Sequence, residues 1–248
     1  MPEHSNHSSP PRPLVITHGS LADRDLYEKW DRVRLAVFGD ELGWHLASRS
    51  PGASEPRDPC DEHAIFFAAI SRGSIVGILR ALNVGLAFPH RELFETHLRR
   101  SDLHRHLAMV WTLNALAVVP SRRRAMFVGP GGSRIGTAAG LLLSASLERI
   151  ATCGGRVVLA TVLSAASAKA FIRAGFSLLD VPVAGPEHHE FLLANVGMVL
   201  PAPVGQHDAP EDVSYFRMCR QYFDGRHSEV MAGTSVDALF ATSEVGSA

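Results

Sequence analysis

The run "MVWTLNALAVV" (Met109–Val119) and the later run "GPGGSRIGTAAG" (Gly129–Gly140) decide the fold. The first is long, apolar and rich in residues that favour strands, so it predicts a buried central strand with room for a bulge at Asn114. The second predicts a glycine-rich turn that leads into a helix, and Gly154 and Gly155 end that helix. A strand, a turn and a helix in this order are typical of an α/β protein that binds its ligand near the turn.

Outward from this unit, hydrophobic periodicity predicts elements on both sides. A helix is expected over 21–42 with Asp23 as its cap, and a hairpin is expected over 64–83 with its turn at 71–73. The other expected elements are a loop at 45–63, a short helix at 89–100, a strand at 156–162, a helix at 164–175, strands at 176–183 and 190–200, and a helix at 212–223. This order predicts a mixed β-sheet flanked by helices.

The 248 residues suit one domain with additions at both ends. We expect a flexible N-terminal tail at 1–13, a main domain at 14–200, and a C-terminal extension at 201–248 that holds one helix and a mobile end. A net charge of −1 argues against a nucleic-acid-binding protein. Three scattered cysteines fit a reducing compartment, and the longest apolar run is too short to span a bilayer. These features predict a cytoplasmic enzyme without stable membrane insertion. The sequence leaves open whether it is a monomer or a homodimer.

The glycine-rich turn presents free backbone N–H groups at a helix N-terminus, where the helix dipole favours an anion. Arg134 and Gly136 are the candidates there for binding a phosphate. No Gly-Lys-Ser/Thr follows, so the turn is not a Walker loop, and it fits the dinucleotide fingerprint poorly. A flexible loop of small residues is the alternative interpretation.

Six residues of the N-terminal half stand in an ordered pattern: Arg34, Phe38, Trp44, Asp58, Asp61 and Arg80. With "FIRAGF" (Phe171–Phe176) after the turn, this pattern resembles the acyl-homoserine-lactone (autoinducer) synthases, a branch of the N-acetyltransferase (GNAT) superfamily. The resemblance covers roughly residues 24–199. It implies a GNAT-like twisted sheet. It also implies transfer of an acyl group from acyl-carrier protein or acyl-CoA to the amine of S-adenosylmethionine, which gives an N-acyl-homoserine lactone signal.

The sequence departs from that family at the central strand. The family has a Trp-Glu-x-x-Arg pattern, and here Thr112 and Ala115 stand in place of its glutamate and arginine. Two alternatives therefore stay open. One is an N-acyl amino acid synthase of the same fold, with an amino acid as acceptor, and the other is a non-catalytic sensor of acyl thioesters.

The chemistry of the pattern agrees with an acyltransferase. Asp58 and Asp61 can orient an ammonium group by charge-assisted hydrogen bonds, and Trp44 can stack on a sulfonium or ammonium cation. Arg34 and Arg80 can hold the aspartates or bind the carboxylate of the acceptor. Each residue also has a plain structural interpretation: a turn cap for the aspartates, the edge of the core for Trp44, and a helix-face contact for Arg34 with Phe38. His63, beside Asp61, is the one histidine that we consider as a base.

The donor side is predicted from the same strand and the segments after it. Backbone N–H groups near 116–118 can stabilise an oxyanion. Arg122 and Arg124, in "PSRRR", either attract acyl-carrier protein or coenzyme A phosphates or belong to a solvated loop. The run 160–163 lines an acyl-chain tunnel or belongs to the core. The predicted substrate-binding residues are Phe38, Thr112, Asn114, Leu116, Val118 and Thr161. No metal site is expected, since His188 and His189 have no third ligand at a suitable spacing.

Overall fold

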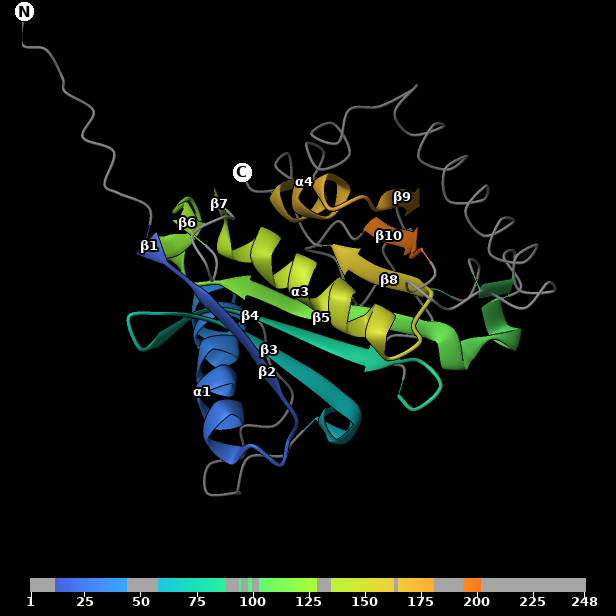
Figure 1. Cartoon of the computed structure of the whole chain (residues 1–248), viewed down its shortest axis with the longest axis horizontal. Helices are drawn as coiled ribbons and strands as arrows, with labels where there is room; N and C mark the ends of the chain where they lie inside the picture. The colour runs from blue at the N-terminus through green and yellow to red at the C-terminus, as the bar shows by residue number, and fades with distance from the viewer. Residues whose placement is uncertain are drawn as a thin grey trace, which may run out of the picture.

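The computed structural model describes residues 12–43, 58–87, 94, 98–99, 103–128, 135–162, 165–180 and 194–201. Within these residues the main feature is a seven-stranded sheet in the order β2-β3-β4-β5-β8-β10-β9 (Figure 1). Its strands are β2 (Val15–Gly19), β3 (Ala64–Ser71), β4 (Ser74–Asn83), β5 (Val110–Val118), β8 (Val157–Val162), β10 (Ala194–Val199) and β9 (Ser177–Asp180). β5 and β8 are parallel and the other neighbours are antiparallel, so the predicted mixed α/β sheet is confirmed.

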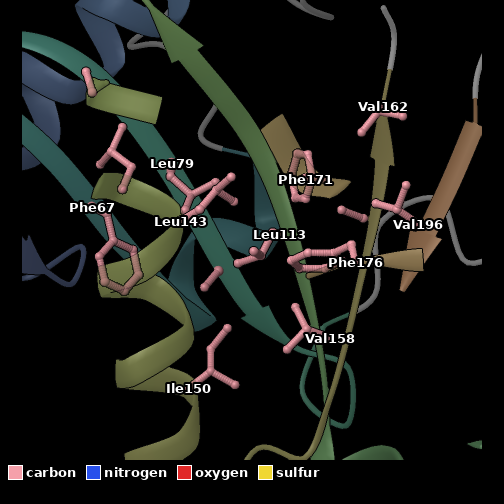
Figure 2. Close-up of a cluster of buried hydrophobic side chains, with 14 of the residues drawn as sticks. Phe67, Leu79, Leu113, Leu143, Ile150, Val158, Val162, Phe171, Phe176 and Val196 are labelled. Carbon is pink, nitrogen blue, oxygen red and sulfur yellow. The ribbon is translucent and has the colours of Figure 1, made fainter. Parts of the chain in front are cut away.

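Helices cover both faces of this sheet. Neighbouring residues of β3 show the division, because side chains alternate along a strand. Phe66 packs in one hydrophobic cluster with Trp30 of α1 (Arg24–Arg34), whereas Phe67 packs in another with Leu143 of α3 (Ala138–Thr152). Figure 2 shows this second cluster, which also receives Phe171 from α4 (Ala165–Arg173). One face of the sheet therefore belongs to α1 and the other to α3 and α4.

The first helix confirms the expected helix in this region. Asp23 caps it by accepting a hydrogen bond from the Leu26 backbone N–H at 3.2 Å. The regular helix then continues as a π-helix, η1 (Leu35–Glu41), in place of the α-helix expected up to residue 42. π-Helical turns are rare and often lie at functional sites.

The hairpin of β3 and β4 is also confirmed. Its turn residues Arg72 and Gly73 both have positive φ, at 53° and 75°, which is the backbone of the two-residue turns that join twisted strands. The short 3-10 helices of the described chain are η2 (Pro59–His63), η4 (Leu103–Arg105), η5 (Leu107–Met109) and η6 (Pro120–Arg122).

β5 carries the predicted bulge, displaced by one residue. Arg80 pairs with Asn114 and Ile78 pairs with Ala117, so two residues of β5 lie opposite Leu79 alone. Ala115, the first of the two, has a φ of 53°. The extra residue is therefore Ala115 rather than the predicted Asn114, whose side chain stays in register.

Beyond the bulge the two parallel strands separate. β5 pairs with β8 only from Val110 to Leu113, whereas β8 stays paired with β10 up to Val162. Figure 2 shows the two strands diverging past Val158. The sheet therefore opens between the second half of β5 and the end of β8.

Several elements differ from the expectations. β2 was not predicted, since a five-residue edge strand with a histidine and a glycine gives a weak pattern. The last two residues of the expected tail form β1 (Arg12–Pro13), which joins β6 (Phe127–Val128) and β7 (Ile135–Gly136) in a small second sheet.

The helix expected at 212–223, the C-terminal extension beyond Pro201 and most of 89–100 lie outside the described residues. None of the described helices has the length and apolar character needed to cross a membrane.

Candidate active site

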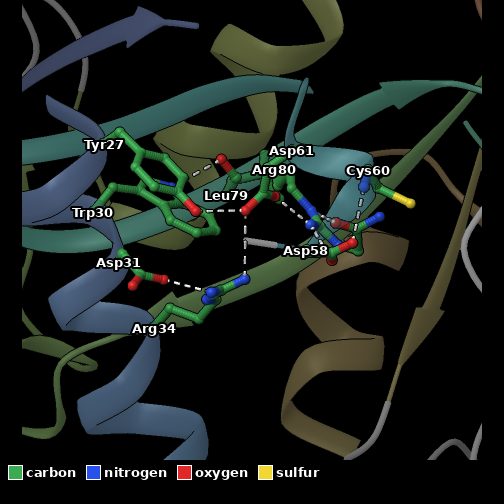
Figure 3. Close-up of polar contacts among 10 residues, drawn as sticks. Tyr27, Trp30, Asp31, Arg34, Asp58, Cys60, Asp61, Leu79 and Arg80 are labelled. Carbon is green, nitrogen blue, oxygen red and sulfur yellow. Dashed lines mark hydrogen bonds and ion pairs between the residues drawn. The ribbon is translucent and has the colours of Figure 1, made fainter. Parts of the chain in front are cut away.

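Arg80 of β4 is the centre of a polar cluster on the α1 face of the sheet (Figure 3). Its Nη1 donates to Asp58 Oδ2 and to Asp61 Oδ1, both at 2.5 Å, and its Nε donates to Asn114 Oδ1 at 2.6 Å. Arg80 is only 7% exposed, so these three acceptors replace most of the water that its guanidinium has lost. The cluster links η2, β4 and the start of the bulge.

The Asp-x-x-Asp spacing places both carboxylates on Arg80 through the turn η2. Asp58 caps this turn by accepting from the Cys60 backbone N–H at 3.0 Å, and the Asp61 backbone N–H donates to the Asp58 carbonyl at 2.8 Å. The interpretation as a turn cap is therefore correct for Asp58, and the same carboxylate also binds Arg80.

The two aspartates differ in exposure. The Asp61 side chain is fully buried, and its Oδ2 accepts from the Tyr27 hydroxyl at 2.7 Å, with Arg34 Nη1 at 3.8 Å. The Asp58 side chain keeps 31% of its surface exposed. Among the described residues, then, Asp58 is the member of the pair whose carboxylate an incoming molecule can reach.

The electrostatics of the cluster favour a charged Asp58 and a neutral Tyr27. Burial opposes ionisation of Asp58, but the guanidinium of Arg80 outweighs it and lowers the pKa of that carboxyl. Burial and the hydrogen bond to Asp61 raise the pKa of Tyr27 above its usual range. Burial also raises the pKa of the Cys60 thiol, with Asp58 adding to the effect. At neutral pH the accessible group of the cluster is an anion.

The predicted residues of α1 and η1 lie beside this cluster. Arg34 forms an ion pair with Asp31 at 2.6 Å and stands 5.6 Å from the centre of the Trp30 ring, within cation–π range. Phe38 is buried in the hydrophobic cluster of α1. Trp44 lies outside the described residues, while Glu41, three positions earlier, binds Arg123 through both carboxylate oxygens at 2.6 Å.

A second polar pair lies on the other side of the opening in the sheet. Thr161 of β8 donates to Asn195 of β10 at 3.1 Å. Alternation along β8 places Thr161 on the face that carries Arg80, because Ala160 and Val162 pack in the α3 cluster. One polar pair, Arg80 with Asn114, thus lies before the opening, and Thr161 with Asn195 lies beyond it.

The other predicted residues of β5 are spread over both faces. Thr112 is buried, and its hydroxyl has no hydrogen-bond partner among the described residues. Leu116 packs against the α3 cluster, while the Val118 carbonyl accepts from Arg123 Nε at 2.9 Å.

The phosphate site predicted at the glycine-rich turn lies at the start of α3, which covers the opposite face of the sheet from Arg80. Gly136 pairs with Phe127, and Thr137 after it caps α3 by accepting from the Gly140 backbone N–H at 3.2 Å. Arg134 lies outside the described residues. A cavity of about 360 Å³ lies between α3 and α4, and it begins at the first turn of α3. Its lining residues are Gly140, Ser144, Leu147, Ala170, Arg173 and Ala174.

Two further basic residues flank the Glu41–Arg123 pair. Arg122 is half-buried and Arg124 is exposed. The sequence predicts that these two bind the donor, whereas the ion pair with Glu41 belongs to Arg123. Nowhere in the described parts of the chain do three His, Cys, Asp or Glu side chains meet in a group that could hold a metal ion.

Tyr27 is the residue of this site that sequence reasoning missed. It precedes Arg34 by seven positions, which places the two on the same face of a helix. That spacing was the available signal, but a tyrosine there is equally typical of the core.

No family model matches the sequence. No curated protein matches it either. Solved structures do match the fold. The AHL synthase LasI is 16% identical, with a TM-score of 0.52 over 79% of this chain and 100% of LasI. BjaI, a CoA-dependent acyl-homoserine lactone synthase solved with SAM and isopentyl-CoA, is 18% identical, with a TM-score of 0.51 over 94% of this chain and 99% of its own. TofI in an apo form is 16% identical, with a TM-score of 0.51 over 74% and 89%. The chain therefore has the fold of the acyl-homoserine lactone synthases, which is the GNAT-like fold that the sequence resemblance implies.

Proposed function

We propose that this protein is an N-acyltransferase that moves an acyl group from an acyl thioester to the amine of S-adenosylmethionine, as the first step toward an N-acyl-homoserine lactone. One observation carries the proposal. Asp58 is a partly exposed carboxylate held by Arg80, and Arg80 also holds Asn114, directly before the bulge where the sheet opens.

Asp58 is the proposed site for the amine. Its lowered pKa keeps it anionic at neutral pH, so it accepts a hydrogen bond from the amine and directs the nitrogen lone pair. Arg80 fixes the direction of this carboxylate through a bond of 2.5 Å. Positioning of this kind lowers the barrier because it removes the entropic cost of bringing two reactants together.

The opening between β5 and β8 is the proposed site for the thioester. The sequence predicts the N–H groups that stabilise the oxyanion near 116–118. Residues 117 and 118 pair with β4, whereas 115 and 116 lie outside this regular pairing, so the backbone N–H groups of 115 and 116 are the proposed donors. The amine attacks the carbonyl carbon, the C–N bond forms, the C–S bond breaks, and the thiol leaves. The proton that the nitrogen loses passes to solvent, to which Asp58 is open.

Ring closure would follow in the acylated product. Its carboxylate attacks the γ-carbon beside the sulfonium, the C–S bond breaks, and methylthioadenosine leaves as a neutral thioether. This step requires no further group on the protein beyond those that orient the carboxylate. Arg34, within 4 Å of Asp61 and 16% exposed, is the candidate for that role.

A second candidate, an N-acyl amino acid synthase, is favoured by the central strand. The family to which the sequence is similar carries a glutamate and an arginine where this chain has Thr112 and Ala115. The Thr112 hydroxyl is buried without a partner among the described residues. A strand that lacks both charged residues of the family suits a different amine acceptor.

The acyl donor is either acyl-CoA or acyl-carrier protein. The cavity between α3 and α4 favours acyl-CoA, because Arg173 in its lining suits a phosphate and Leu147 suits the face of a base. Arg122 and Arg124 are the residues that would instead attract the acidic surface of a carrier protein.

The test compares the purified protein with its Asp58→Asn variant, using S-adenosylmethionine or amino acids and an acyl thioester. Asparagine is also a good cap, so the turn is retained while the charge is removed. We expect thiol release and, by mass spectrometry, an acyl-homoserine lactone from the wild type, with a loss of roughly 100-fold or more in the variant. Glu62→Gln, an exposed acid in the same turn, is the matched control and should retain activity.

An open-chain N-acyl amino acid would support the second candidate instead. Binding of the thioester without any thiol release would make the protein a sensor and overturn the enzyme proposal.

A further inference from the structure

We infer that Tyr27 is a positioning residue for the acceptor amine, and that it acts through Asp61 and Arg80 on Asp58. The inference rests on the proposed function. It gives the two aspartates different roles: Asp58 contacts the acceptor, and Asp61 holds Arg80 in position.

The Tyr27 hydroxyl has a fixed direction. It donates to Asp61 Oδ2 at 2.7 Å and so joins α1 to the turn η2. The ring packs edge-on against Phe66 at 5.0 Å and lies parallel to Trp30 at 6.5 Å. Trp30 is itself held by hydrogen bonds from its Nε1 to the carbonyls of Phe67, at 3.1 Å, and Leu79, at 3.4 Å. The tyrosine is therefore anchored to two strands of the sheet.

Asp61 transmits this position to Arg80. With its side chain fully buried, Asp61 cannot meet an incoming molecule, and its two oxygens are used by Arg80 on one side and Tyr27 on the other. Among the described residues, removal of the tyrosine hydroxyl leaves Oδ2 with Arg34 alone, at 3.8 Å, which is beyond hydrogen-bond distance. The carboxylate would then be free to turn about its own axis.

The same nitrogen of Arg80 serves both aspartates. Nη1 is 2.5 Å from Asp61 Oδ1 and 2.5 Å from Asp58 Oδ2, so a rotation of Asp61 shifts the donor that directs Asp58. Besides Arg80, the described partners of the Asp58 carboxylate are the backbone N–H and the thiol of Cys60, and both belong to the same short turn as Asp58 itself. The orientation of the exposed carboxylate therefore depends on the buried one.

Loss of the Tyr27 hydroxyl should weaken binding of the acceptor amine and leave binding of the acyl thioester unchanged. The proposed donor cavity lies between α3 and α4, on the opposite face of the sheet from Tyr27. The sheet and its hydrophobic core separate the Tyr27 hydroxyl from that cavity. Replacing Tyr27 by Phe keeps the ring, so the packing of the core is retained.

The test is steady-state kinetics of the full chain with each substrate varied in turn, for the wild type and Tyr27→Phe. We expect the KM for the amine to rise roughly 3- to 10-fold, the range that one hydrogen bond supplies, with the KM for the thioester unchanged. The matched control is Phe66→Leu, which loosens the packing around Tyr27 but keeps its hydroxyl. This control should lose stability without a selective rise in the amine KM.

para-Aminophenylalanine at position 27 provides the rescue. It restores an N–H donor at the position of the hydroxyl, so it should return the amine KM to the wild-type value. An unchanged amine KM in Tyr27→Phe, or an equal rise in Phe66→Leu, would overturn the inference while leaving the acyltransferase proposal intact. Failure of the wild type to release thiol would instead reject the proposed function itself.

Discussion

Glu41 and Arg123 meet in a two-pronged ion pair, with both carboxylate oxygens 2.6 Å from the guanidinium nitrogens. The pair joins the end of the π-helix η1 to the turn after β5, 82 positions away in the sequence. Arg123 also donates to the Val118 carbonyl at 2.9 Å, so its guanidinium is held at both ends. The segment that leads to Trp44 is thereby attached to the strand that carries the bulge.

Replacing Glu41 by Gln should lower the melting temperature more at low salt than at high salt, because a half-exposed ion pair is screened by ions. The hydrogen bonds from Arg123 lower the pKa of Glu41, so its contribution is present above the ordinary carboxyl pKa and is lost as the pH falls through the lowered value. Thermal denaturation at two salt concentrations and at pH 7 and 3 measures both effects. Asp40→Asn removes a neighbouring exposed charge and should show neither.

Tyr27 predicts a change of stability at the alkaline end. Because burial and Asp61 raise its pKa in the folded state, its contribution is complete below pH 10 and is lost as the pH rises beyond that. The difference in the free energy of unfolding between wild type and Tyr27→Phe should therefore shrink above pH 10, by at most about 1.4 kcal/mol per pH unit. Urea denaturation at pH 8, 10 and 11 measures it. A constant difference across this range would show that the hydroxyl titrates normally in the folded protein.

Arg173→Ala should show whether the cavity between α3 and α4 binds the nucleotide of coenzyme A. If Arg173 binds a phosphate of coenzyme A, its loss should raise the KM for acyl-CoA roughly 10-fold or more, the effect of a hydrogen bond to a charged group. The KM for an acyl-pantetheine, which has no nucleotide, should stay the same. Arg149→Ala, an exposed arginine in the last turn of α3, is the matched control. An equal effect of Arg173→Ala on both donors would contradict a phosphate site.

The order of elements could be predicted from the sequence because long strands and capped helices carry periodic patterns. The hairpin turn at Arg72–Gly73 and the helix capped by Asp23 are examples. The bulge could be placed only to within a residue, since Asn114 and Ala115 differ in register rather than in hydrophobicity. β2 could not be predicted because it depends on pairing with β3 more than on its own residues.

The sequence predicts which residues form the candidate site, but it does not predict what each of them does there. Spacing indicated that Asp58, Asp61 and Arg80 belong together, yet it could not reveal that Asp61 is buried and Asp58 exposed. The buried carboxylate accepts a hydrogen bond from Tyr27, on a helix that begins more than thirty residues earlier. Contacts between distant segments of this kind have no signature in a single sequence.

Thr112→Val should raise the stability of the protein and lower its activity. A buried hydroxyl without a partner costs about 1–3 kcal/mol, so replacing it by a methyl group of the same shape should raise the free energy of unfolding by about 1 kcal/mol. A group kept at such a cost is expected where function requires it, and the sequence predicts Thr112 to bind substrate. We therefore expect a stabilised variant with at least a several-fold lower kcat/KM for the amine. Thr161→Val is the stability control, since its hydroxyl is bonded to Asn195 and its loss should destabilise the protein. A stabilised Thr112→Val protein with full turnover would place Thr112 in the core and remove it from the site.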